Sequence, residues 1–196
     1  MIELKDSDAL IVVDVQNDFL PGGALAVPNG DQVVPVLNGY IERFVRAKKL
    51  SPLPIFATRD WHPPNHCSFQ SQGGPWPPHC ISGTFGAQFS PDLKLPKETR
   101  VISKATDPNR EAYSGFDGTD LEQQLRQLGS QRLFIGGLAT DYCVLNTVRD
   151  ACCLGFEVFL LRDAVRAVNL HPSDEQKALD EMQRLGVRFI TLHDLT

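Results

Sequence analysis

The chain has 196 residues, of which 42% are hydrophobic and 22% are charged, a composition typical of a folded globular domain. Its formal net charge is −5 with no basic cluster, which argues against nucleic acid or an anionic membrane as a partner. No apolar run approaches the ~18 residues that a membrane-spanning helix needs, and no secretory signal pattern opens the chain. We therefore expect one cytoplasmic domain over residues 1–196.

Strand and helix signals alternate along the chain. Short apolar runs such as ALIVVDV are typical of strands that are buried on both faces, and apolar residues at three- and four-residue spacing predict helices. The predicted strands are 9–15, 53–60, 99–105, 132–137, 156–161 and 187–192. The predicted helices are 31–49, 118–130, the Cys143 segment to about Leu154, and 173–186. Capping boxes at Thr119–Glu122 and Ser173–Gln176 mark two of the helix starts.

This alternation predicts a three-layer α/β/α fold, in which a six-stranded, mostly parallel sheet is covered by helices on both faces. Residues 61–98 are the exception, because they are rich in Pro, Gly, His and aromatic residues and lack periodicity. A loop of this length inside a compact domain is usually functional. Neither G-x-G-x-x-G after the first strand nor G-x-x-x-x-G-K-[ST] occurs, so a nucleotide site is not expected.

Reactive side chains stand at the ends of four consecutive predicted strands: Asp14, Asp60, Lys104 and Cys143. Ligands of open parallel sheets bind beyond the carboxyl ends of the strands, so we expect these groups to meet there. Each alone has a structural explanation, since a buried free cysteine or a strand-end lysine is common. Together they predict a nucleophilic thiol, with Asp14 as proton acceptor and Lys104 as balancing charge. A cap from Thr140 or Asp141 would place Cys143 in a first helical turn, which favours the thiolate.

A second set of residues has the chemistry of a metal site. Asp60 and His62, with His79 after the loop, supply one carboxylate and two imidazoles. This set suits a divalent transition metal with open coordination positions, and Zn²⁺, Fe²⁺ and Mn²⁺ all fit it. His66 is a further candidate ligand. Surface histidines are common in loops, so this segment alone is moderate evidence.

The five cysteines are an odd number and form no C-x-x-C pair, so neither a disulfide framework nor a zinc ribbon is expected. Free thiols in a reducing compartment fit this pattern better. Cys152 and Cys153 have no functional explanation, and we expect them to be buried packing residues.

The chain resembles the nicotinamidases, also called pyrazinamidases, of the isochorismatase-like cysteine hydrolase superfamily. The resemblance covers nearly the whole chain and keeps the order of the family's motifs. The motifs are ALIVVDVQNDFLPGGALAV, TRDWHPPNHCSF, WPPHC, VISKAT, AYSGFDGTDL and GLATDYCVLNTVRDA. Together they are highly specific, although each alone would be weak.

The resemblance implies a role for each site residue. Asp14, Lys104 and Cys143 look like the family's catalytic triad, and Asp60, His62 and His79 look like ligands of one divalent metal ion per subunit, with Zn²⁺ favoured. The same resemblance implies a cis peptide between Leu138 and Ala139, an oxyanion hole from the N–H groups of Ala139 and Cys143, and residues 61–98 as a metal-binding loop insertion. The residues implied to line the substrate pocket are Phe19, Trp76, Tyr113 and Leu138.

The implied activity is hydrolysis of nicotinamide to nicotinate and ammonia in NAD salvage, through a thioester on Cys143, with pyrazinamide as a second substrate. The metal would bind the pyridine nitrogen and orient the ring. The sequence also allows two alternatives: a hydrolase of another small amide or carbamoyl compound, and an inactive binding module that keeps the fold. Assembly into a homo-oligomer also stays open.

Overall fold

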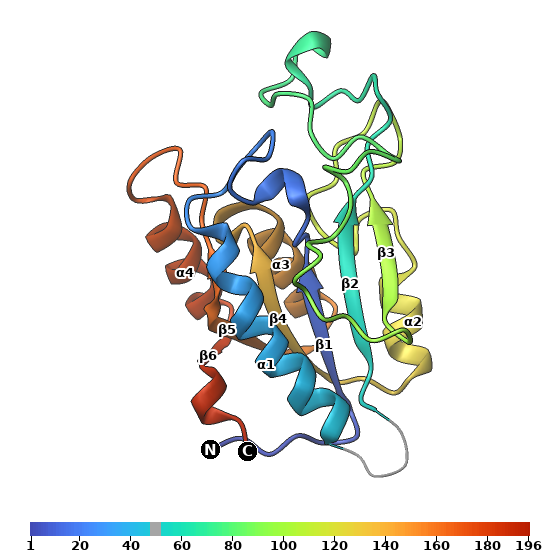
Figure 1. Ribbon diagram of the computed structural model, residues 1–196. Helices are drawn as coiled ribbons and strands as arrows, with labels where there is room; N and C mark the ends of the chain where they lie inside the picture. Colours follow the sequence, from blue (N-terminus) through green and yellow to red (C-terminus); the bar gives the residue numbers. More distant parts are fainter. Residues whose placement is uncertain (48–51) are drawn as a thin grey trace.

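The computed structural model describes residues 1–47 and 52–196 and contains the predicted six-stranded sheet (Figure 1). All five strand pairings are parallel, in the order β3–β2–β1–β4–β5–β6. The strands are β1 (Asp8–Val13), β2 (Ile55–Asp60), β3 (Arg100–Lys104), β4 (Arg132–Leu138), β5 (Glu157–Arg166) and β6 (Arg188–Ile190). The predicted α/β class and the parallel sheet are thus confirmed.

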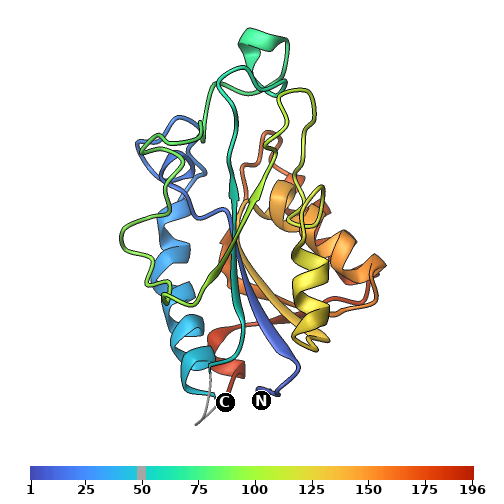
Figure 2. The same ribbon diagram turned by 90° about the vertical axis from the view of Figure 1, so that its right-hand side faces the viewer.

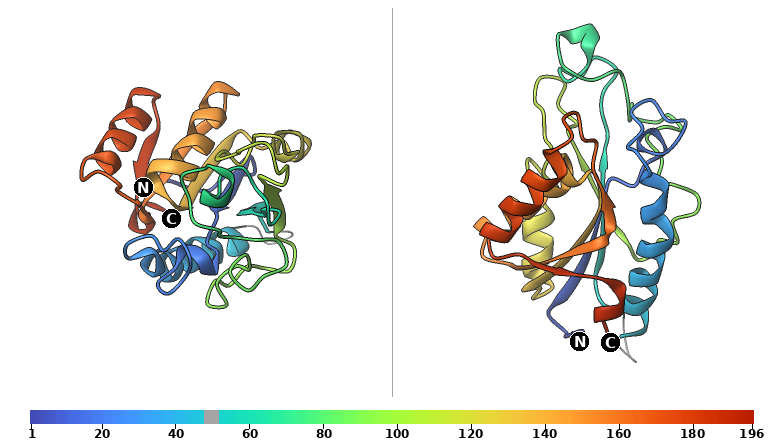
Figure 3. Two further views of the ribbon diagram at one scale, coloured as in Figure 1. Left: turned by 90° about the horizontal axis from the view of Figure 1, so that it is seen from above. Right: turned by 90° about the vertical axis from the view of Figure 1, so that its left-hand side faces the viewer.

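Helices cover both faces of the sheet, so the fold has the three predicted layers (Figures 2 and 3). One face is covered by α1 (Val33–Arg46), and the other by α2 (Leu121–Gln127), α3 (Leu145–Cys153) and α4 (Asp174–Arg184). Alternate residues of β1 point to opposite faces: Leu10 and Val12 pack in the core under α1, and Ala9 and Ile11 pack in the core under the other helices. A strand buried on both faces must be apolar throughout, which explains the uninterrupted hydrophobic run in the sequence.

Short helical turns connect these elements. The turns η1 (Asn17–Phe19), η2 (Gly30–Gln32), η3 (Gln70–Gln72) and η5 (Leu192–Asp194) are 3₁₀-helical, and η4 (Thr140–Val144) is a π-helical turn. Much of the long segment 61–98 lies beyond the carboxyl ends of β2 and β3, at the top of Figure 1. The fold therefore places this histidine-containing segment above the edge of the sheet where reactive side chains were expected.

The structure differs from the predictions at several element boundaries. α2 and α4 begin without a side-chain capping hydrogen bond, so neither predicted capping box forms. The predicted helix 31–49 is observed as α1, and residues 48 and 49 lie outside the described residues. β5 continues to Arg166, beyond the predicted end at 161. In the part of the chain that the structure describes, no helix is long and apolar enough to cross a membrane.

Candidate active site

The carboxyl edge of the sheet brings the four predicted strand-end residues together. Asp60 ends β2 and Lys104 ends β3, and the two residues are direct partners in the β2–β3 register. Asp14 follows β1 in the left-handed region with φ of 48°, and its N–H donates to the carbonyl of Thr58 in β2. Cys143 lies in η4, directly after β4. Residues far apart in sequence therefore meet because parallel strands end at one edge.

Lys104 is the centre of this group. Its ammonium Nζ lies 2.9 Å from Asp14 Oδ2 and 2.5 Å from Asp60 Oδ1, and it lies 3.4 Å from Cys143 Sγ. It also donates to the carbonyl of Ala112 at 3.2 Å. The lysine is 1% exposed, so the two carboxylates compensate a charge that could not otherwise be buried.

Burial and the neighbouring charges shift the pKa of each group. Burial lowers the pKa of Lys104, but Asp14 and Asp60 outweigh this effect and hold that pKa well above its ordinary value. Burial raises the pKa of Asp14, although the ammonium of Lys104 opposes the shift. At Asp60 the balance is reversed, since burial raises the pKa but Lys104 and His62 bring it below its ordinary value. Lys104 therefore stays charged, and of the two carboxylates Asp14 accepts a proton more readily.

The electrostatics of Cys143 differ from the prediction. Burial raises the pKa of its thiol well above the ordinary value, and the opposing effect of Lys104 is insufficient to reverse this. The predicted helix cap is also wrong: η4 has no capping side chain, and the carboxylate of Asp141 accepts hydrogen bonds from the N–H groups of Val168 and Asn169. Cys143 is consequently a protonated thiol, which would need a base before it could act as a nucleophile.

Asp60, His62 and His79 form one compact group, in which one candidate ligand atom from each residue lies within 4.8 Å of the other two. The Nδ1 atoms of both histidines contact backbone carbonyls, at 3.2 Å to Ala105 for His62 and 2.8 Å to Pro77 for His79. His62 Nε2 lies 3.6 Å from Asp60 Oδ2 and is buried without a hydrogen-bond partner among the described residues. Carbonyl contacts at Nδ1 orient metal-binding imidazoles, so the donor set fits a divalent metal.

His66 lies beside this group but has other partners. Its ring packs on that of His62 with centroids 4.2 Å apart. Its Nδ1 contacts the hydroxyl of Ser68 at 2.7 Å, and its Nε2 contacts the carbonyl of Arg110 at 3.1 Å. Both ring nitrogens thus have polar partners, and His66 lies outside the group that Asp60, His62 and His79 form.

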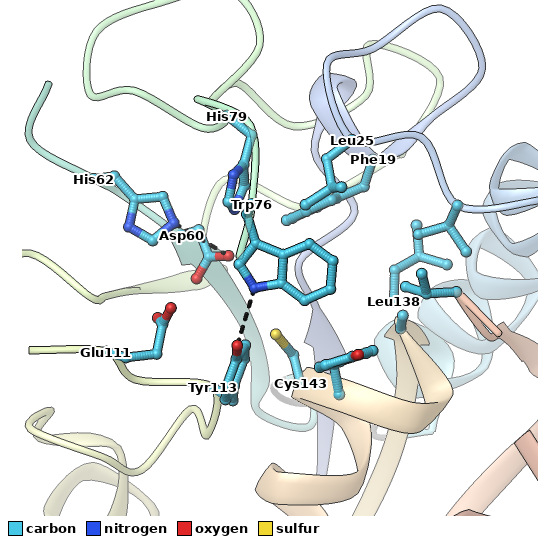
Figure 4. A pocket seen from close by; sticks show the side chains of 14 residues that line it. Phe19, Leu25, Asp60, His62, Trp76, His79, Glu111, Tyr113, Leu138 and Cys143 are labelled. Atoms are coloured by element: carbon cyan, nitrogen blue, oxygen red, sulfur yellow. Dashed lines mark hydrogen bonds and ion pairs between the residues drawn. The ribbon is translucent and has the colours of Figure 1, made fainter. Parts of the chain in front are cut away.

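A pocket opens between the thiol of Cys143 and the candidate metal-ligand group that Asp60, His62 and His79 form (Figure 4). All four predicted pocket residues line it: Phe19, Trp76, Tyr113 and Leu138. The indole N–H of Trp76 donates to the hydroxyl of Tyr113 at 3.0 Å and fixes the two rings relative to each other. The aromatic walls are those of a site for a small, flat molecule.

Sequence reasoning missed five residues that line the pocket: Leu25, Val27, Glu111, Tyr142 and Val168. Tyr142 directly precedes Cys143 and its ring contacts that of Trp76 edge-on, so its position next to the thiol was a usable signal. The aliphatic residues offered no such signal, because in sequence they resemble core residues.

The turn from β4 into η4 contains Ala139 and Cys143, the two residues expected to supply an oxyanion hole. The peptide between Leu138 and Ala139 is cis, which confirms the geometry that the resemblance implied. Ala139 and Cys143 both line the pocket.

Comparison with known proteins shows the family to which this chain belongs. The sequence matches the isochorismatase domain family over residues 8–194. The chain belongs to the isochorismatase family. Within this family it is 39% identical to a nicotinamidase of Escherichia coli over 207 residues, with 95% of each chain covered.

Two solved structures of the isochorismatase fold are similar over nearly their whole length. A pyrazinamidase of Pyrococcus horikoshii in complex with zinc is 52% identical with a TM-score of 0.88, and the match covers 94% of this chain and 99% of that one. PnC1 from L. infantum in complex with nicotinate is 36% identical with a TM-score of 0.90, covering 100% and 98%.

Proposed function

We propose that the protein is a metal-dependent cysteine amidohydrolase that converts nicotinamide to nicotinate and ammonia, with pyrazinamide as a second substrate. One observation carries this proposal: the Cys143 thiol and the three residues of the metal-ligand group line the same aromatic pocket. The nicotinamidase and pyrazinamidase relatives, one of them with nicotinate bound, support the choice of substrate. We further propose that residues 1–196 form one domain in which 61–98 is the metal-binding loop.

In the first half of the reaction, Asp14 takes the proton of the Cys143 thiol while Sγ attacks the carboxamide carbon. Burial raises the pKa of Asp14, which suits a group that must both accept and return a proton. The N–H groups of Ala139 and Cys143 stabilise the oxyanion of the tetrahedral intermediate. Asp14 then gives its proton to the departing nitrogen, so that the C–N bond breaks, ammonia leaves and a thioester remains.

In the second half, water attacks the thioester. Asp14 is again a carboxylate and takes one proton from the water as its oxygen bonds to the acyl carbon. The C–S bond breaks, and the thiolate recovers a proton from Asp14. Lys104 keeps its positive charge throughout, and its contacts with Asp14 and Sγ stabilise the negative charge that moves between them.

The metal-ligand group has a separate task in this proposal. Asp60, His62 and His79 would hold one divalent ion per subunit, for which we propose Zn²⁺, with Fe²⁺ and Mn²⁺ as alternatives. When bound, such an ion would act as a Lewis acid toward the pyridine nitrogen and would help to orient the ring. Phe19, Trp76, Tyr113 and Leu138 enclose the flat ring and keep the carboxamide facing Cys143.

Replacement of the nucleophile tests the proposal. We expect Cys143→Ala to lower ammonia release from nicotinamide by roughly 10⁴-fold or more, because no other group can form the acyl intermediate. Metal content, measured by elemental analysis, should stay equal to that of the parent protein. Cys153→Ala is the matched control, since Cys153 is exposed on α3 and its removal should leave turnover unchanged.

Other outcomes point to other functions. Retained turnover in Cys143→Ala would exclude the thiol mechanism. Activity of the parent protein on another amide or a carbamoyl compound, but not on nicotinamide, would favour a different substrate with the same chemistry. A parent protein that binds no metal and releases no ammonia would instead be an inactive binding module.

A further inference from the structure

Gln16 is wholly buried two residues after Asp14, and its carboxamide is bonded to the backbone of the metal-ligand group. Its Oε1 accepts a hydrogen bond from the N–H of Asp60 at 2.8 Å, and its Nε2 donates to the carbonyl of the same residue at 2.8 Å. Nε2 also donates to the carbonyl of Ala87 at 2.9 Å. One side chain thus pairs with both polar backbone groups of a candidate metal ligand.

The carboxamide of Gln16 stands in for backbone groups that β1 lacks beside Asp60. The backbone register between β1 and β2 ends at Val13 and Thr58, because the chain turns away at Asp14. Asp60 lies two residues beyond the last pair, where β1 offers no peptide group to it. The carboxamide of Gln16 has the donor and acceptor of a peptide group, and it makes the two bonds that a longer β1 would make.

Asp18 makes an analogous contact on the other side of the metal-ligand group. Its Oδ2 accepts a hydrogen bond from the N–H of Cys80 at 2.7 Å, and Cys80 directly follows His79. Its Oδ1 accepts from the N–H of Ala24 at 3.2 Å. The short segment after β1 therefore contacts the backbone at Asp60 and next to His79, two ligands that lie nineteen positions apart in sequence.

We propose that Gln16 and Asp18 are positioning residues that set the geometry of the metal site relative to the thiol, an inference that rests on the proposed metal site. Asp14, which serves the thiol, is two residues from Gln16, so one rigid segment connects the proton acceptor with the metal ligands. Groups that orient metal ligands from outside the coordination shell change metal affinity by about 10- to 100-fold when they are removed.

The test compares metal affinity with fold stability in Gln16→Met, Asp18→Asn and a control, Asn17→Ala. Methionine matches the shape of glutamine but makes none of its three hydrogen bonds, and asparagine keeps one of the two carboxylate acceptors. Asn17 lies in the same segment and donates to the carbonyl of Phe85 at 2.9 Å, away from the ligands. For each metal-free protein, the Kd for Zn²⁺ is measured by chelator competition, the Co²⁺ absorption spectrum is recorded, and the Tm is determined.

We expect the Kd for Zn²⁺ to rise at least 10-fold in Gln16→Met and by a smaller factor in Asp18→Asn, with an altered Co²⁺ spectrum in both. Asn17→Ala should stay within about twofold of the parent protein. A purely structural role would lower the Tm and leave the Kd unchanged, because a protein that is still fully folded at the assay temperature binds metal normally.

A Kd within about twofold of the parent in a folded Gln16→Met protein overturns the proposal. If Gln16→Met does not fold, Asp18→Asn decides it by the same criterion. Failure of the proposed function is a separate result, because it would show as a parent protein that binds no stoichiometric metal or releases no ammonia from nicotinamide.

Discussion

Cys143 shows how much a residue's surroundings decide its chemistry. The thiol is buried beside Asp14, Asp60 and Lys104; burial raises its pKa, and of these neighbours only Lys104 opposes the rise. A thiol that stays protonated is a poor nucleophile until a base removes its proton. The site therefore resembles a general-base system more than a preformed thiolate, and reactivity should depend on a substrate that triggers the proton transfer to Asp14.

This leads to a prediction about pH. Because the thiol pKa is raised in the folded protein, the thiolate fraction at pH 8.5 should be well below the half that an ordinary cysteine shows with its pKa of about 8.5. The alkylation rate of Cys143 with iodoacetamide should therefore keep rising above that pH. The rate is measured by mass spectrometry on metal-free protein carrying serine at positions 67, 152 and 153, with a cysteine peptide as reference. A midpoint below 8.5 would contradict the expected direction.

The residues of the candidate site could largely be predicted from sequence, but their electrostatics could not. The position of Asp14, Asp60 and Lys104 at strand ends was enough to expect them together, because parallel strands share an edge. The depth of burial depends on the loops that cover this edge, and no sequence pattern encodes it. For the same reason Gln16 was missed, since its contacts with Asp60 and Ala87 join segments 44 and 71 residues away.

At the scale of elements, Gly137 of β4 pairs with Val13 at the end of β1. Gly137 has φ of 125°, and a Cβ added to it would lie 2.1 Å from the carbonyl oxygen of Val13. Only glycine combines this conformation with this approach. The glycine therefore allows β4 to run close to β1 one residue before Leu138 in the pocket wall.

We expect Gly137→Ala to lower the free energy of unfolding by roughly 3 kcal/mol or more, because the new methyl group must displace the backbone of β1. Gly129→Ala is the matched control, since Gly129 also has a positive φ of 69° but open space around it. That control should cost only about 1 kcal/mol. Urea denaturation of both proteins measures the difference, and equal losses would show that backbone conformation alone matters at Gly137.

Element types were easier to predict than element boundaries. Doubly buried strands require continuous apolar runs, so all six strands were visible in the sequence. The start of α2 was misplaced because the hydroxyl of Thr119 donates to the carbonyl of Gly115 and closes an earlier turn. Cys153, expected in the core, is exposed, so that prediction is wrong, whereas Cys152 is half-buried and packs against the core as expected.

At the scale of the molecule, the edge of the sheet where the strands end and the edge where they begin hold different groups of residues. The carboxyl edge holds the candidate active site, while the amino edge holds a buried ion pair between Asp8 and Arg132, which begin β1 and β4. Arg132 donates to both carboxylate oxygens, at 2.6 and 2.7 Å, and its guanidinium lies over the ring of Phe159. The length of the sheet separates this ion pair from the pocket, so stability and chemistry can change independently.

Arg132→Met should therefore destabilise the protein without altering its activity. Loss of one partner leaves the buried carboxylate of Asp8 uncompensated, at a cost of roughly 3–5 kcal/mol in unfolding free energy. The kcat/KM for nicotinamide, measured where the protein is folded, should be unchanged. Arg188→Met is the control, because its exposed pair with Glu157 at 3.5 Å contributes less than about 1 kcal/mol. A fall in kcat/KM that exceeds the unfolded fraction would show that the two edges are coupled.

Asp60 belongs to two groups at once, one with His62 and His79 and one with Asp14 and Cys143, and in each the candidate ligand atoms lie within 4.8 Å of one another. A short inhibitor that joins a metal-binding nitrogen to an electrophilic carbon could therefore attach at both places without a linker. Once one end is bound, the other is held at a high effective concentration, so the two weak attachments reinforce each other. Loss of either the thiol or the proposed metal ion would reduce such a bivalent inhibitor to a monovalent one.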